Sequence, residues 1–204
     1  LERAVASIAR NAAAQTRLVE DLIDISRLST GKLRLSLQTV DVRSIAEGAA
    51  DAVRPLAVTR GVSLALLLPP APCLVHGDAE RLQQVVWNLL SNAIKFTDTG
   101  SVNTHLSVHT LADGRLEIGI SVIDTGPGVP NAIAEAIFVA FEQGPSNASR
   151  GGTGLGLFIS RRLARMMGGD LTLEPARRSG AHFRFTLTVD PADPATAVEV
   201  PLND

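Results

Sequence analysis

The chain has 204 residues, which is enough for one sizeable domain with an additional segment. It is 45% hydrophobic and 20% charged, an ordinary balance for a globular protein. A formal net charge of −2 gives no general electrostatic attraction to nucleic acid, so we expect no nucleic-acid partner.

The first expected element is a long amphipathic helix over residues 1–29, which Gly31 ends. Its apolar side chains recur in steps of four and three residues, as in a helix that packs against another helix. They are Leu1, Val5, Ile8, Ala12, Val19 and Leu22, with Leu18, Ile25 and Leu28 widening the stripe. No other segment offers a matching stripe. With its partner helix missing, we expect this helix to expose apolar surface and to self-associate.

The rest of the chain alternates short helices and strands. Alternating leucines predict a strand over 33–37. Asp41 and Asp78 stand where N-caps are expected, before helices that run to about Thr59 and Phe96. The remaining elements follow from apolar runs and turn residues. They are a strand over 62–68, two strands over 101–111 and 115–124 joined by a turn at 112–114, a short helical stretch over 130–137, a turn-rich segment over 142–152, a helix over 154–167, and a hairpin that pairs 170–174 with 181–189.

Polar residues share one face of the helix over 78–96, because they recur every three or four residues. They are Arg81, Gln84, Asn88, Asn92 and Lys95. A plain solvated face would give the same pattern, but asparagine is a mediocre helix former, and Glu, Lys or Gln would serve better there. An asparagine side-chain oxygen suits Mg²⁺, which takes a few protein oxygens and completes its shell with water and phosphate. Lys95 could then reach the phosphates.

The strand over 115–124 ends in Asp124, which a Thr-Gly-Pro-Gly turn follows. A carboxylate can accept a hydrogen bond from the exocyclic amine of adenine, and Gly126 and Gly128 let a base lie against the main chain. An ordinary tight turn after a strand has the same composition. Asp-Thr-Gly is also the signature of aspartic proteases, so that alternative stays open.

A glycine-rich loop over 151–157 leads directly into a helix. Exposed backbone N–H groups at a helix start make a site for anions such as phosphate. A flexible linker is a poor alternative, because Leu155, Leu157 and Ile159 are interleaved apolar residues. The loop lacks the Gly-Lys-Ser/Thr end of a P-loop, and Ile159 stands where the dinucleotide-binding fingerprint has its third glycine.

Taken in order, these segments resemble the N, G1, F and G2 boxes of sensor histidine kinases. The matching segments are Asn88–Phe96, Asp124–Gly128, Phe138 with Phe141, and Gly152–Leu157. Leu18–Lys32 resembles the end of that family's dimerisation hairpin. The resemblance covers about residues 1–189.

This resemblance implies an α+β fold. It would be a two-layer α/β sandwich of the type shared with Hsp90, MutL and gyrase, a mixed sheet with helices on one face, preceded by one long helix. The implied domains are 1–31, the second helix of a dimerisation and phosphotransfer hairpin; 32–190, an ATP-binding catalytic domain; and 191–204, a linker or tail.

The resemblance also implies ligand positions. Asn92 would be a ligand of Mg²⁺, Asn88 would lie beside the phosphates, and Asp124 would recognise adenine. Phe138 and Phe141 would anchor the base of a lid over 142–153, with simple core packing an equal alternative. The expected ATP-binding residues are Asn88, Asn92, Lys95, Phe96, Asp124, Gly126, Gly128, Val129, Arg150, Gly152, Thr153, Gly154, Leu155, Gly156 and Leu157.

ATPases of the same superfamily have Glu at the position of Asn88, where it is a general base. An amide cannot take a proton in this way, so phosphoryl transfer to another nucleophile is favoured over hydrolysis. The expected function is the ATP-binding catalytic core of a sensor histidine kinase, which transfers the γ-phosphoryl of MgATP to a histidine for relay to a response-regulator aspartate. The alternatives are an ATPase or serine kinase of the same superfamily, and a scaffold that binds no nucleotide.

Two departures from the family pattern matter. The acceptor histidine is absent, because His76, His105, His109 and His182 lie in strand or turn contexts. No catalytic residue is therefore assigned, and the chain should not autophosphorylate. Ala181 stands where the family often has Ser or Thr near adenine, which leaves one water-mediated contact unsupported.

The chain has no signal peptide, no initiating Met and no apolar run near the ~20 residues that span a bilayer. We therefore expect an excerpt of a longer protein, cytoplasmic as a domain, with any membrane attachment in segments outside this chain. The expected partners are a response-regulator receiver domain and, through the N-terminal helix, a second copy of the protein. The single cysteine, Cys73, cannot form an internal disulfide and suits a reducing compartment as a small buried residue.

Overall fold

The computed structural model describes residues 2–142, 153–175 and 179–191; in the N-terminal helix it describes the side chains from residue 18 onward and a few before it. None of the helices in these ranges is long and apolar enough to cross a membrane.

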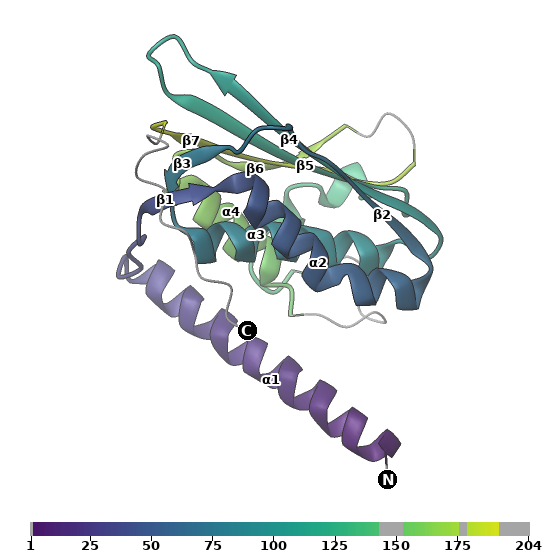
Figure 1. Cartoon of the computed structure of the whole chain (residues 1–204). Helices are drawn as coiled ribbons and strands as arrows, with labels where there is room; N and C mark the ends of the chain where they lie inside the picture. Colours follow the sequence, from purple (N-terminus) through teal and green to yellow (C-terminus); the bar gives the residue numbers. More distant parts are fainter. Residues whose placement is uncertain (1, 143–152, 176–178, 192–204) are drawn as a thin grey trace.

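A mixed sheet and a layer of three helices make up the body of the molecule (Figure 1). Helices α2 (Val42–Arg60), α3 (Ala79–Phe96) and α4 (Gly156–Met166) cover one face of the sheet, and the long helix α1 (Glu2–Ser29) lies beyond them. This arrangement confirms the expected α+β fold class with helices on one face.

The sheet has five strands in the order β2-β4-β5-β7-β6. β2 and β4 are parallel, and the other neighbouring pairs are antiparallel. A separate two-stranded ribbon pairs β1 with β3. The strands are β1 (Gln38–Asp41), β2 (Val62–Leu67), β3 (Leu74–Gly77), β4 (Gly100–Thr110), β5 (Leu116–Asp124), β6 (Leu171–Glu174) and β7 (His182–Val189).

The core lies between the sheet and α3. Side chains at helical spacing on α3 and alternate side chains on β5 are fully buried, and each contributes about 1.5–3 kcal/mol of hydrophobic free energy. They include Leu82, Val85, Val86, Leu90, Ile118, Ile120 and Val122. Because the apolar face of α3 is buried in this way, its polar residues lie on the other side of the helix, where Gln84, Asn88, Asn92 and Lys95 line a cavity.

Both expected N-caps are confirmed. Asp41 Oδ1 accepts from the backbone N–H of Arg43 at 3.1 Å, and Asp78 Oδ1 accepts from that of Arg81 at 3.1 Å. Each cap satisfies a backbone donor that the first turn of a helix leaves unpaired. Asp78 thereby fixes where α3 begins, and so which of its residues face the cavity.

One expected element was wrong, one element was not expected, and the expected short helical stretch is confirmed as separate turns. Residues 33–37 form no strand, and pairing begins only at Gln38. The leucines lie in a connection along which burial decreases, from Leu33 at 8% exposed to Leu37 at 63% exposed. β3, the partner of β1, was not expected. The helical stretch over 130–137 consists of two single-turn 3-10 helices, η1 (Asn131–Ile133) and η2 (Ala136–Phe138).

Helix α1 is exposed on one side and fixed on the other. Leu18, Val19, Leu22 and Ile23 are 40–55% exposed, which confirms the expected apolar surface over this part of the helix. Asp24, by contrast, is only 5% exposed, and its Oδ2 accepts from Arg81 Nη1 at 2.9 Å and from Gln84 Nε2 at 2.8 Å. The C-terminal half of α1 is therefore attached to α3. Self-association remains a prediction.

Candidate functional site

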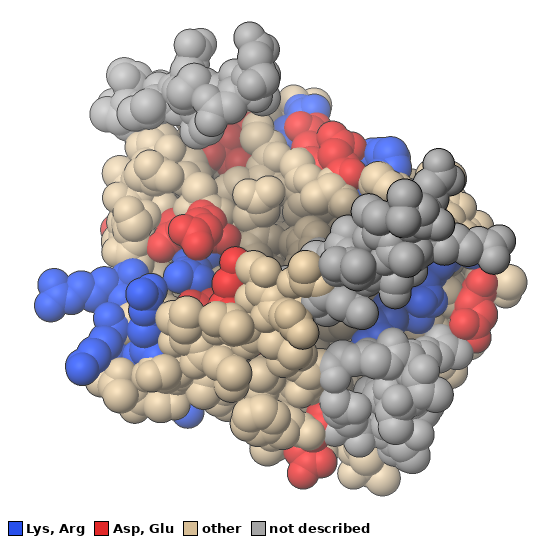
Figure 2. Space-filling model, turned by 90° about the horizontal axis from the view of Figure 1, so that it is seen from below, with Lys and Arg blue, Asp and Glu red and all other residues tan. Residues whose placement is uncertain are grey.

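A cavity of about 900 Å³ opens between α3, α4 and the loop that follows β5. In the view from below, the described residues that border the central hollow are mostly uncharged, with acidic side chains near its edge (Figure 2). Of the expected ATP-binding residues, those that line it are Asn88, Asn92, Lys95, Phe96, Asp124, Gly128, Val129, Thr153, Gly154, Gly156 and Leu157. The cavity therefore brings together segments that lie far apart in the sequence.

Asp124 stands at the end of β5, buried to 5% exposure. Its Oδ1 accepts from the backbone N–H of Gly126 at 2.8 Å and from that of Ala181 at 3.2 Å. Burial raises the pKa of Asp124, and these two hydrogen bonds oppose the rise. The described residues donate nothing to Oδ2, so one carboxylate oxygen remains for a ligand.

Close main-chain contacts fix the loop after Asp124. Gly128 has φ +77°, and a Cβ there would lie 2.7 Å from the carbonyl oxygen of Gly180. A Cβ on Gly126 would lie 2.8 Å from the carbonyl oxygen of Phe96. The backbone therefore approaches its neighbours more closely than any side chain allows. Gly126 shapes the loop without lining the cavity itself.

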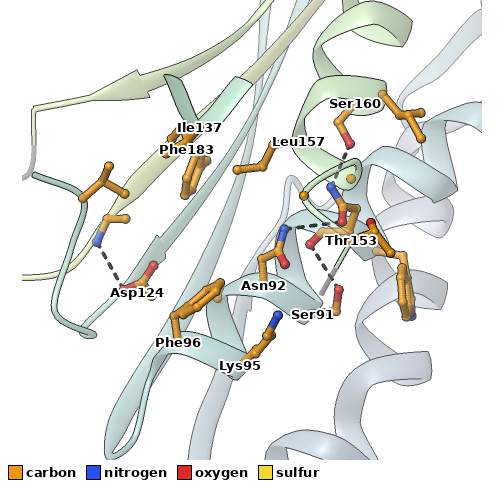
Figure 3. A pocket seen from close by; sticks show the side chains of 18 of the residues that line it. Ser91, Asn92, Lys95, Phe96, Asp124, Ile137, Thr153, Leu157, Ser160 and Phe183 are labelled. Carbon is orange, nitrogen blue, oxygen red and sulfur yellow. Dashed lines mark hydrogen bonds between the residues drawn. The ribbon is translucent and has the colours of Figure 1, made fainter. Parts of the chain in front are cut away.

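The two asparagines of α3 form a chain of amides (Figure 3). Asn92 Nδ2 donates to Asn88 Oδ1 at 3.4 Å, and Asn88 Nδ2 donates to Ser160 Oγ at 2.9 Å. Ser160 lies on α4 and is 1% exposed, so it anchors the chain of amides in the core. Because Asn92 donates through its nitrogen, its oxygen can bind a cation or accept a hydrogen bond.

This donor set fits Mg²⁺. No group of three or more His, Cys, Asp or Glu side chains in the described part of the chain would hold a metal by itself. A Mg²⁺ ion here would take Asn92 Oδ1 and rely on phosphate and water for its other ligands, as Mg²⁺ commonly does.

The glycine loop meets α3 opposite these amides. A Cβ on Gly156 would overlap the amide of Asn88, so a larger residue there would force that amide to move. Thr153 Oγ1 accepts from the backbone N–H of Leu155 at 3.1 Å and donates to Asp21 Oδ2 of α1 at 3.3 Å. Leu155 itself is 1% exposed and belongs to the core, so it is not a lining residue.

Two expected residues, Arg150 and Gly152, lie outside the described residues. Of the expected anchors of the lid base, Phe138 is buried, whereas Phe141 is 65% exposed with φ +66° and does not pack into the core.

The sequence did not reveal the apolar wall of the cavity, because apolar lining residues read as core. The lining residues that were not expected include Trp87, Ile133, Ile137, Phe183 and, from α1 and α2, Glu20, Asp21, Leu56 and Arg60. Ala181 was noted for its missing hydroxyl, whereas its role here is a backbone one, as a donor to Asp124.

Residues 77–191 match the model of the histidine kinase-, DNA gyrase B- and HSP90-like ATPase family, and the chain belongs to that family. Its curated relatives are histidine kinases. It is 36% identical over 187 residues to hybrid signal transduction histidine kinase D of Dictyostelium discoideum, covering 90% of this chain and 12% of that protein. It is 33% identical over 198 residues to the histidine-protein kinase BarA of Escherichia coli, covering 96% and 22%. The chain thus spans a small part of these relatives.

Solved structures of histidine kinases have the same fold as this chain. The crystal structure of full-length ShkA in complex with AMPPNP has a TM-score of 0.73 and 33% identity, covering 87% of this chain and 36% of that one. The Acinetobacter baumannii histidine kinase AdeS has a TM-score of 0.70, covering 90% and 82%; at 22% identity that similarity shows the fold alone. The fold of this chain is that of a histidine kinase catalytic domain.

Proposed function

We propose that this chain binds MgATP in the cavity, with adenine at Asp124 and the phosphates between the amides of α3 and the glycine loop. The observation that supports this proposal most is that segments far apart in the sequence meet at one cavity. Three segments, the polar row of α3, the loop after Asp124 and the turn over 153–157, line one cavity. Each alone has an ordinary structural explanation, but their meeting in one place suits a ligand with a polar base at one end and an anion at the other.

At the base end, Asp124 Oδ2 would accept a hydrogen bond from the exocyclic amine of adenine. At the phosphate end, Lys95 would neutralise phosphate charge, and the start of α4 would present backbone N–H groups. Asn92 would bind Mg²⁺, which when bound neutralises charge on the phosphates. Binding and orientation are most of what a protein contributes to phosphoryl transfer.

In the full protein, we propose that the nucleophile is a histidine outside this chain. Its ring nitrogen would form a bond to the γ-phosphorus as the bond to the ADP oxygen breaks, and the phosphoryl group would pass on to an aspartate of a receiver domain. The names of the two relatives above, a hybrid signal transduction histidine kinase and a signal transduction histidine-protein kinase, support this. We further propose that the full protein dimerises through α1 and that this domain is cytoplasmic, where ATP is available.

Hydrolysis by this chain is the rival activity, and Asn88 argues against it. Both ends of the Asn88 amide are already engaged, with Asn92 and Ser160. An amide is no general base, so water at the γ-phosphorus would find none at this position.

Calorimetric titration with Mg-AMPPNP tests the proposal directly. We expect saturable one-site binding by the wild-type chain and much weaker binding by Asp124→Ala. A folded wild-type chain that gives no heat and no melting shift would leave the scaffold alternative standing. Steady release of phosphate from ATP by the isolated chain would instead favour the ATPase alternative.

A further inference from the structure

Arg161 lies on α4 outside the cavity and bridges three parts of the chain. Its side chain is 17% exposed. Nε donates to Asp170 Oδ1 at 3.1 Å, just before β6, and Nη1 donates to Glu135 Oε2 at 3.0 Å, just before η2. Glu135 is 85% exposed, so this second ion pair is weakened by solvent.

The more informative contact of Arg161 is with an aromatic ring. Its guanidinium carbon lies 4.5 Å from the centroid of Phe138, within the range of a cation–π interaction. Phe138 is buried, and its ring meets Phe183 edge to face, with centroids 6.4 Å apart and planes at 82°. The stack Arg161–Phe138–Phe183 therefore runs from the outside of α4 to the strand β7.

The inner end of this stack is a wall of the cavity. Phe183 lines it, and so does Ile137, the neighbour of Phe138 (Figure 3). Phe183 pairs with Val122 across the β5–β7 ladder, two residues before Asp124 and on the same face of the sheet. The wall held by Phe138 therefore belongs to the Asp124 end of the cavity.

Arg165 shows what Arg161 does beyond its ion pairs. Arg165 Nε also donates to Asp170 Oδ1 at 3.1 Å, but its side chain is 52% exposed. Neither Glu135 nor Phe138 is among the contacts of Arg165 in the described residues. Two arginines thus share one carboxylate, and only one of them reaches the aromatic stack.

We propose that Arg161 is a positioning residue for the base of the nucleotide: it holds Phe138 so that Phe183 and Ile137 keep the apolar wall against which a purine ring lies. This inference rests on the proposed binding of MgATP. It assigns no contact between Arg161 and the ligand, and it concerns the base and not the phosphates.

The test compares Arg161→Met with Arg165→Met. Methionine keeps an unbranched apolar stem and removes the guanidinium. We expect Arg161→Met to weaken Mg-AMPPNP binding about five- to tenfold, whereas Arg165→Met changes it less than about twofold. Urea unfolding of both apo proteins accounts for stability. Equal losses in the two variants, or none in either, would overturn the inference.

A second measurement separates positioning from general support. If Arg161 acts through Phe138, then Phe138→Leu should weaken binding, and adding Arg161→Met to it should weaken binding no further. Additive losses would overturn the inference.

Arg161→Lys is a further check, since it keeps the charge but not the planar stack, and it should bind like Arg161→Met and unlike the wild type. Failure of the folded wild-type chain to bind Mg-AMPPNP would count against the proposed function, whereas normal binding by Arg161→Met would count against this inference alone.

Discussion

The two ends of the cavity are built in different ways. At the Asp124 end, main-chain groups do the positioning: two backbone N–H groups hold the carboxylate, and Gly128 packs directly on Gly180. At the α3 end, side chains hold one another, from Asn92 through Asn88 to Ser160. Close main-chain contacts allow only one backbone conformation, whereas side-chain amides can rotate and exchange hydrogen-bond partners. We therefore regard the base end as preformed and the phosphate end as adjustable.

The largest effect is expected at the base end. Asp124→Ala removes the proposed acceptor for the adenine amine and leaves the N–H groups of Gly126 and Ala181 without their partner. We expect Mg-AMPPNP affinity to fall by about 100-fold, since hydrogen bonds to charged groups contribute about 1.5–3 kcal/mol each. Calorimetry gives the affinity. Asp124→Asn separates the two losses: its amide oxygen can still accept from both N–H groups, but its NH2 group would then face the adenine amine and cannot accept from it, so its affinity should fall as well while its fold keeps these two hydrogen bonds. Wild-type affinity in Asp124→Ala would mean that the base lies elsewhere.

A preformed base end should not tolerate a methyl group in its main-chain contact. Gly128→Ala should destabilise the fold by about 2 kcal/mol, because it combines positive φ with a clash against Gly180. Gly114 has φ +86° with nothing within 4 Å of a Cβ, so Gly114→Ala measures the effect of φ alone. Urea unfolding compares the two. Equal losses would show that the close contact with Gly180 has no energetic consequence.

At the phosphate end we expect a smaller and conditional effect. Asn92→Ala should weaken AMPPNP binding about tenfold in Mg²⁺, because it removes the oxygen that we propose as a ligand of the metal. In EDTA the same substitution should have much less effect. Gln83, exposed on the same helix, offers the control Gln83→Ala. An equal loss with and without Mg²⁺ would remove Asn92 from the metal site.

The smallest expected effect is a pH dependence specific to the base end. Since burial raises the pKa of Asp124 above its ordinary value of 3.8, nucleotide affinity should begin to fall, as pH is lowered, above the range in which exposed aspartates titrate. Stability should change in the opposite sense. The contribution of Asp124 to folding is fully present below its unfolded-state pKa and is lost as pH rises through the folded-state pKa. Titrations of affinity and of unfolding free energy against pH, with Asp124→Asn as control, check both signs.

The polar and glycine motifs of the site could be predicted from the sequence, whereas its apolar wall and some short elements could not. The asparagine row was found because residues three and four apart must share a helix face, and the glycine loops because few other functions need so many glycines. The apolar wall, with Ile133, Ile137 and Phe183, was missed because burial against a ligand and burial in a core select the same residues. β3 was missed because its four residues, Leu-Val-His-Gly, do not alternate between apolar and polar side chains, unlike the equally short β6. The leucines over 33–37 were misread because alternation alone supplies no partner strand, and of the three leucines only Leu33 is fully packed into the core.

The buried carboxylate of α1 has a further consequence. An α-helix rises about 1.5 Å and turns about 100° per residue, so a shift of α1 by one residue would place Ile23 or Ile25 where Asp24 now faces Arg81. An arginine left without its counter-charge in such a place costs about 3–5 kcal/mol. The Asp24–Arg81 ion pair thus fixes the position and rotation of the long helix α1 relative to α3. A displacement of α1 along or about its axis must therefore either carry α3 with it or break this ion pair.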